Sequence, residues 1–187
     1  MKKIMFNDKF CLTQAVLAGS KTMTRRLLKD NVPLGNWEET QKHLPYKVGE
    51  VVAIAQRYKE VYPNADFEMV GDDFMNESAG WTNKMFVRAD LLPHHIRITD
   101  VKIEHLQDIS DKECLREGVK RASIGFYAEG VKVKDCEKEA HRETASGCLK
   151  LFPFPRPAFA SLIDKISGKG TWESNPFVVA YSFKLID

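Results

Sequence analysis

The chain has 187 residues, of which 43% are hydrophobic and 29% charged, a composition typical of a globular protein with one domain. Its net charge of +2 is too small to indicate a nucleic-acid-binding protein by itself, and no run of about 18 apolar residues predicts a membrane span. Because no apolar signal core follows the N-terminal lysines, we expect a cytoplasmic protein with no membrane partner.

The cysteines and histidines do not indicate a metal site. None of the four cysteines forms a Cys-x-x-Cys pair, which favours scattered free thiols in a reducing compartment. His94 and His95 are adjacent, and adjacent side chains on a strand point to opposite faces. We therefore predict no metal and no other cofactor.

The first predicted element leads into an unusually polar segment. The apolar spacing of residues 10–18 predicts a short helix that begins near Asp8 and ends at Gly19. Residues 21–26 then contain two hydroxyls and three cations. Because a packed core excludes that density of polar groups, residues 21–26 are expected to face solvent or to bind a ligand, most naturally an anion or a nucleic-acid-like molecule.

Strands and loops follow this segment. Residues 30–45, which contain two prolines, predict a loop, and residues 48–55 predict a turn and a buried strand. Residues 60–80 are polar and predict an exposed insertion between strands. Residues 84–89 predict a short strand.

The alternation of apolar residues slips by one position near Thr99 and Asp100. Ile96 and Ile98 share one phase, whereas Val101 and Ile103 share the other. The slip predicts a β-bulge or a bend, which small barrels use to close.

Two further helices and a last strand are predicted in the C-terminal half. Ser110 begins a capping-box sequence, and the helix should run to residue 116 or 117 with Gly118 as its end. Residues 119–150 have weak periodicity and predict an insertion. Pro157 predicts the start of a helix that Gly168 ends, and residues 177–186 alternate as a strand.

These elements predict an α+β fold. Strands outnumber helices and no strand–helix–strand alternation appears, so a small, bent, mostly antiparallel barrel with flanking helices fits best. We expect residues 1–187 to form a single domain with insertions at about 60–80 and 119–150.

The segment Gly19-x-Lys21-x-x-Thr24-x-Arg26 resembles the signature of ASCH (activating signal cointegrator homology) domains, with Thr24 in place of the usual glutamate. The rest of the chain is similar to the longer bacterial and phage-borne ASCH proteins. The resemblance implies a PUA-like β-barrel with a cleft, and RNA or nucleotide-like ligands as partners. The matching segments are residues 46–52, 98–109 and 172–176.

One branch of small ASCH proteins removes the acetyl group from N(4)-acetylcytidine with a lysine, a threonine and a glutamate. Lys21 and Thr24 match the first two positions, and an ungapped alignment from Leu106 places Glu117 at the third. The resemblance therefore implies catalytic roles for Lys21, Thr24 and Glu117. An alcohol nucleophile needs a base, and lysine can act as one only if its pKa falls well below about 10.4.

Each of these residues also has an ordinary structural interpretation. None of these alternatives needs a ligand: Lys21 could be a solvated cation, Thr24 a turn hydroxyl and Glu117 a surface ion-pair partner. Among the arginines, Arg25 and Arg26 are stronger candidates for binding, because a guanidinium matches phosphate or a base edge.

The predicted function is therefore that of a binding module for RNA, a nucleotide or a modified nucleoside. An amidohydrolase acting on an N(4)-acylated cytidine is the alternative, and a protein-interaction module that uses residues 119–150 is a further one. A buried cluster of the three catalytic candidates would favour the enzyme, and an exposed basic stripe onto Lys29, Lys47 and Arg57 would favour the binding module. The predicted ligand-binding residues are Lys21, Thr22, Arg25, Arg26 and Tyr58, with Trp81 and Trp172 as further stacking candidates.

Overall fold

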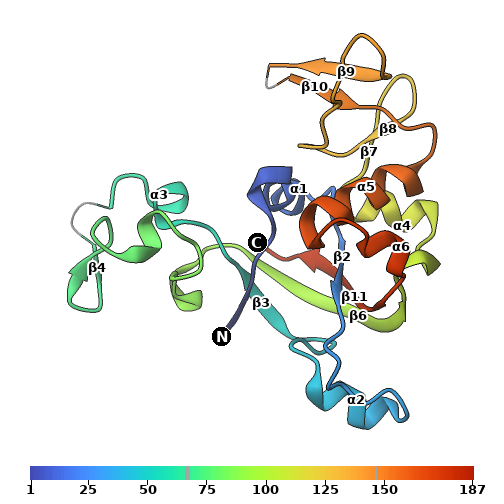
Figure 1. Ribbon diagram of the computed structural model, residues 1–187. Helices are drawn as coiled ribbons and strands as arrows, with labels where there is room; N and C mark the ends of the chain where they lie inside the picture. Colours follow the sequence, from blue (N-terminus) through green and yellow to red (C-terminus); the bar gives the residue numbers. More distant parts are fainter. Residues whose placement is uncertain (66–67, 146) are drawn as a thin grey trace.

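The computed structural model describes residues 1–65, 68–145 and 147–187 and has an α+β fold. Its centre is a five-stranded sheet in the order β1-β3-β6-β11-β2 (Figure 1). β1 pairs with β3 in parallel, and the other three pairings are antiparallel. The strands are β1 (Lys2–Ile4), β2 (Met23–Leu27), β3 (Val51–Ile54), β6 (His95–His105) and β11 (Phe177–Leu185).

A bulge bends the sheet where the sequence predicts one. Asp100 of β6 pairs with Ser182 of β11, and the next pair is Ile98 with Phe183, so Thr99 has no partner on β11. The extra residue lets the apolar side chains before and after it point into the same core. The predicted slip near Thr99 and Asp100 is confirmed.

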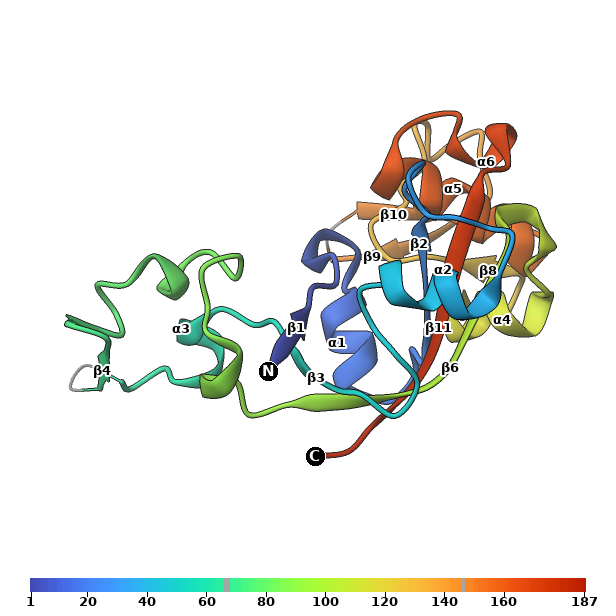
Figure 2. The same ribbon diagram turned by 90° about the horizontal axis from the view of Figure 1, so that it is seen from below.

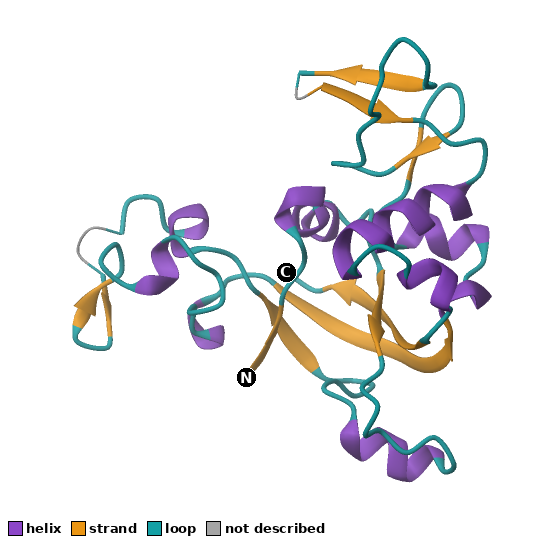
Figure 3. Ribbon diagram, in the orientation of Figure 1, coloured by secondary structure: helices purple, strands orange, loops and turns teal. Residues whose placement is uncertain are grey.

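The helices surround this sheet. α4, α5 and α6 lie together beside β2 and β11, and in Figure 3 they form one purple group next to the orange strands. The helices in the described residues are α1 (Leu12–Leu17), α2 (Trp37–His43), α3 (Tyr58–Val61), α4 (Asp111–Arg116), α5 (Pro155–Ser167) and α6 (Thr171–Ser174). Short 3-10 turns are η1 (Asp8–Phe10), η2 (Ala79–Trp81), η3 (Ala89–Leu91) and η4 (Leu106–Asp108).

The main core lies between the sheet and two of these helices. Val16 of α1 and Leu162 of α5 are buried in one cluster with Ile4, Ile98 and Tyr181 of the sheet. α1 and α5 are thereby held against the same sheet. Among the described residues, no helix has both the length and the apolar character needed to cross a bilayer.

The described residues of 55–92 project as a separate lobe between the end of β3 and the start of β6 (Figure 2). The lobe has its own small core, which includes Tyr58, Met75 and Leu92. It contains α3, η2, η3 and the hairpin of β4 (Met69–Val70) and β5 (Asp73–Phe74). Part of the predicted insertion, residues 66–67, lies outside the described residues.

The strand predicted at residues 84–89 is wrong. Asn83 turns the chain there, because its side chain accepts from the Met85 amide and its carbonyl accepts from the Phe86 amide. Met85 and Phe86 are each 62% exposed and pair with no strand. The loop predicted at 30–45 likewise contains α2, which Asn36 caps through the Glu38 amide.

Two predicted helix starts also shift. Asp8 does not cap α1, which begins at Leu12. Its carboxylate instead accepts from the Thr13 hydroxyl and pairs with Lys84. α5 begins at Pro155 rather than Pro157, and it ends at Gly168 as expected.

Residues 119–150, predicted as an insertion, form two small sheets beside α5 (Figure 1). One pairs β7 (Lys120–Arg121) with β8 (Phe126–Tyr127), and the other pairs β9 (His141–Thr144) with β10 (Gly147–Lys150).

Candidate functional site

The end of α1 places Lys21 at the entrance to β2. Gly19 has a φ of 70°, a left-handed conformation that glycine adopts without strain. The amides of Ser20 and Lys21 then both donate to the carbonyl of Ala15, which fixes the turn. β2 follows at once, and its pairing with β11 sets which face each of its side chains takes.

The Lys21 ammonium is buried and fully hydrogen-bonded. Its side chain is 2% exposed, and Nζ donates to the carbonyls of Met23 and Glu117, each at 2.7 Å, and to Glu117 Oε2 at 2.8 Å. Burial lowers the pKa of Lys21, the neighbouring Glu117 carboxylate opposes that shift, and the charges of Arg26 and Arg25 add to it. The pKa remains below the ordinary value of 10.5.

Helix α4 brings Glu117 to this ammonium. Ser110 and Glu113 form the predicted capping box at its start, and Glu117 is the C-cap residue before Gly118, whose φ is 109°. Both the backbone carbonyl and the carboxylate of Glu117 therefore face Lys21. The predicted helix is confirmed, and it places Glu117 against Lys21 although the two are far apart in sequence.

Arg25 extends the Lys21–Glu117 pair into a network of six charges. Its guanidinium contacts three carboxylates, Glu117 at 3.1 Å, Glu113 at 3.1 Å and Glu104 at 2.5 Å. Lys102 pairs with Glu104 at 2.9 Å and with Glu113 at 2.6 Å. We call this cluster the charge network: three cations (Lys21, Arg25, Lys102) balanced by three carboxylates (Glu104, Glu113, Glu117).

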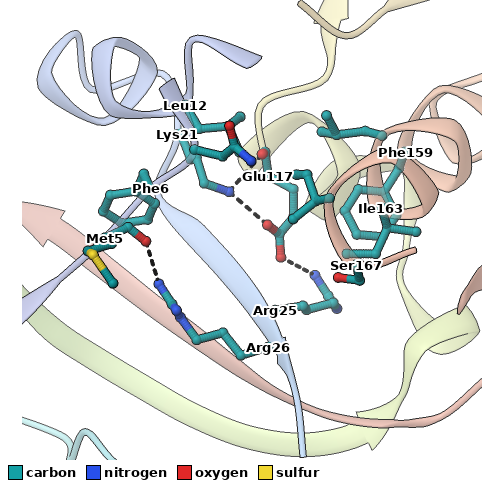
Figure 4. Close-up of a pocket in the computed structure, with 13 residues that line it drawn as sticks. Met5, Phe6, Leu12, Lys21, Arg25, Arg26, Glu117, Phe159, Ile163 and Ser167 are labelled. Atoms are coloured by element: carbon teal, nitrogen blue, oxygen red, sulfur yellow. Dashed lines mark hydrogen bonds and ion pairs between the residues drawn. The ribbon is translucent and has the colours of Figure 1, made fainter. Parts of the chain in front are cut away.

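Arg26 lies on the opposite face of β2 from Arg25 and joins the two edges of the sheet. Its Nη2 donates at 2.7 Å to the carbonyl of Met5, which directly follows β1 (Figure 4). Its Nε is buried and has no hydrogen-bond partner in the part of the chain that the structure describes. A buried donor without a partner is costly, so Arg26 retains capacity to bind an acceptor.

A pocket of about 200 Å³ opens beside these residues. Figure 4 shows Glu117 between Lys21 and the α5 side chains Phe159 and Ile163, with Arg25 beside Ser167. The wall is therefore polar on the side of β2 and α4 and apolar on the side of α5. The pocket is lined by Met5, Phe6, Asn7, Leu12, Lys21, Arg25, Arg26, Glu117, Phe159, Leu162, Ile163, Ile166 and Ser167.

Several predicted site residues lie elsewhere. Thr24 is buried beside Tyr181 of β11, on the opposite face of β2 from Arg25, and does not line the pocket. Thr22 does not line it either, and its hydroxyl accepts from Arg116.

Tyr58, which the sequence predicts as a ligand-binding residue, lies in the core of the projecting lobe and does not line the pocket. Its ring is 1% exposed inside the core of the projecting lobe, and its hydroxyl accepts from the Arg88 amide. A fully enclosed ring has no free face on which a base can stack. Trp81 lies in the same lobe, and Trp172 packs on Phe159.

The cations that would extend a basic stripe from the pocket do not line it. They are Lys29, Lys47 and Arg57, and Arg57 forms an ion pair with Glu60.

The sequence did not predict the pocket wall formed by α5 and by residues 5–7. The apolar stripe of α5 can be seen in the sequence, but a stripe of this kind does not distinguish a helix face in the core from one that lines a pocket.

No group of three or more His, Cys, Asp or Glu side chains in the described ranges is arranged to hold a metal ion. In comparisons with protein families, curated proteins and solved structures, the chain matches none of them.

The charge network predicts a specific loss of stability in acid. Burial alone would raise the pKa of Glu113. Hydrogen bonds from Lys102 and Ser110 and the positive charge of Arg25 outweigh burial, so the pKa falls from 4.5 to about 2. The folded state therefore binds this proton more weakly than the unfolded chain does. The stabilisation by Glu113 is complete above pH 4.5 and is lost as the pH falls toward 2.

Urea unfolding at several pH values between 6 and 2.5 measures this effect. We expect Glu113→Gln to be less stable than the wild type at pH 6, and the difference to shrink toward pH 2.5. Exposed Glu137→Gln is the control and should show little difference at either pH. A difference for Glu113→Gln that stays constant over this range would contradict the assignment.

Proposed function

We propose that the pocket beside Lys21 binds a nucleoside, or the base of a modified nucleoside, either free or in RNA. The observation that carries the proposal is the charge balance of the pocket. The cations Lys21 and Arg25 are already paired with buried carboxylates. Arg26 has no ion pair in the described residues and donates to the Met5 carbonyl, so the pocket offers at most one unpaired guanidinium to a ligand. The polar wall suits an uncharged ligand with hydrogen-bonding groups.

The size and the opposite wall support the same ligand class. A volume of about 200 Å³ is smaller than the roughly 300–1,000 Å³ of pockets that hold drug-sized ligands. Ile163 and the more exposed Ile166 of α5 give this wall an apolar surface beside which a planar ring can lie. On the other side, Arg26 lines the pocket, and a guanidinium can donate to a ring carbonyl oxygen.

We also infer that the bent sheet corresponds to the PUA-like barrel that the resemblance to ASCH domains implies. In the described residues the sheet has two free edges, β1 and β2, and no strand pairing closes it. The bulge at Thr99 and the hydrogen bond from Arg26 of β2 to Met5 beyond β1 support the inference, because together they bring these edges near each other. The pocket lies at this gap.

Hydrolysis of an N(4)-acylated cytidine is the second candidate. The buried, closely spaced Lys21 and Glu117 favour it, together with the lowered pKa of Lys21. Two features rank it below binding. Lys21 donates three hydrogen bonds, which requires the protonated amine rather than a base, and Thr24 does not line the pocket.

One experiment separates the two candidates. Purified protein is titrated with cytidine and with N(4)-acetylcytidine in a calorimeter, and the second mixture is analysed chromatographically for cytidine and acetate. We expect binding of at least one nucleoside and no acetate. Acetate that disappears in both Lys21→Met and Thr24→Val would establish the hydrolase, and neither binding nor turnover would contradict both candidates.

A further inference from the structure

A second cavity lies in the β7–β10 segment, away from the charge network. It has a volume of about 410 Å³ and lies between the β7–β8 turn and β9. We call it the Arg121–Arg142 cavity. It is lined by Arg121, Ala122, Ser123, Ile124, His141, Arg142 and Leu151, and none of these is a carboxylate.

The two guanidiniums of this cavity differ from most cations around them. Lys120, Lys138 and Lys150 of the same segment each pair with a carboxylate. Within the described ranges, neither Arg121 nor Arg142 makes an ion pair. The highly exposed Glu143 has its carboxylate 3.9 Å from Nε2 of His141, another residue of the cavity wall.

Aromatic rings hold both guanidiniums in place. Arg121 lies over the ring of Phe126 at 5.8 Å, and Arg142 lies over the ring of Tyr127 at 4.9 Å. Arg142 also donates to the Tyr127 hydroxyl. A guanidinium stacked on a ring loses less side-chain freedom when it binds an anion, and it keeps its outward N–H groups for a phosphate.

We propose that the Arg121–Arg142 cavity binds phosphate groups of a single-stranded nucleic acid. The choice of this anion rests on the proposed nucleoside-binding function: in the pocket beside Lys21, Arg26 is the one lining cation without an ion pair in the described residues, and it is assigned to the base, so the backbone phosphates need cations elsewhere. Ile124, which is 80% exposed at the rim, and Leu151 add apolar surface next to the guanidiniums, as a base adjacent to a phosphate requires. β8 packs against α5, whose other residues line the first pocket, so both sites flank the same helix.

The test measures binding of a fluorescein-labelled single-stranded oligoribonucleotide of 12 uridines by anisotropy at several salt concentrations. The wild type is compared with the double variant Arg121→Gln/Arg142→Gln. We expect affinity to fall about tenfold at low salt in the double variant. The slope of log K against log salt should become shallower by about 1.4, since each single-strand phosphate contact contributes about 0.7.

A matched control removes two positive charges elsewhere. Arg88→Gln/Lys42→Gln replaces two exposed cations that pair with Asp90 and Glu39, and it should leave the salt slope unchanged. The same slope in both double variants, or no binding of the oligonucleotide by the wild type, would overturn the proposal. Calorimetric binding of free cytidine should be equal in the wild type and Arg121→Gln/Arg142→Gln, so failure of this proposal is distinguishable from failure of the proposed nucleoside site.

Discussion

Glu117→Leu is expected to lower the free energy of unfolding by about 3–5 kcal/mol, because it leaves the buried Lys21 ammonium without its carboxylate. Arg25 loses one of its three carboxylates in the same variant but keeps Glu104 and Glu113. Urea denaturation followed by circular dichroism measures the change. The size of the effect follows from burial, since the same pair at the surface would contribute little.

Two further variants identify the cause of this loss. The double variant Lys21→Met/Glu117→Leu should recover part of the stability, because it removes the unpaired charge as well as its partner. Glu129→Leu, which breaks the half-exposed Lys120–Glu129 pair, is the control and should cost no more than about 1 kcal/mol. Equal losses in Glu117→Leu and Glu129→Leu would contradict a stabilising role for the buried pair.

Ile166→Trp is expected to weaken nucleoside binding by about 100-fold, which corresponds to about 2.7 kcal/mol. Ile166 lines the pocket in the last turn of α5 and is 37% exposed, so a larger side chain has room to extend into the pocket without displacing the core. Calorimetric titration with cytidine measures the change in affinity. The stability of the variant should stay close to that of the wild type, because no charge and no buried core group is removed.

Ile186→Trp supplies the matched control. Ile186 is 40% exposed near the C-terminus and lines no part of the pocket, so the same substitution there should leave cytidine affinity unchanged. Unaltered affinity in Ile166→Trp, with the fold intact, would place the nucleoside elsewhere on the molecule.

The parts of the site that the sequence predicts are those fixed by local rules. The capping box at Ser110 and the glycine at 118 determine the length of α4, and that length brings Glu117 to the height of Lys21. The slipped alternation at Thr99 likewise reveals the bulge, because each side of it keeps its own period of two.

The parts that the sequence does not predict depend on contacts between distant segments. The sequence predicts that Arg25 faces solvent and binds phosphate, but in the structure the carboxylates of Glu104 from β6 and Glu113 from α4 pair with it. Tyr58 reads as a surface aromatic beside polar residues, yet the lobe of residues 55–92 builds a core around it. Neither arrangement produces a pattern in the neighbouring sequence, because the local residues are the same whether the side chain is paired and buried or free and exposed. The resemblance to ASCH domains likewise directs attention to Lys21 and Thr24 but not to the α5 wall.

The most direct test of the proposed pocket is a titration of ¹⁵N-labelled protein with cytidine, followed by amide chemical shifts. We expect the largest shifts at the residues that line the pocket, which are residues 5–7, 12, 21, 25, 26, 117, 159, 162, 163, 166 and 167. Shifts that concentrate on the lobe of residues 55–92 or on the β7–β10 segment, or no shifts at millimolar cytidine, would contradict this expectation.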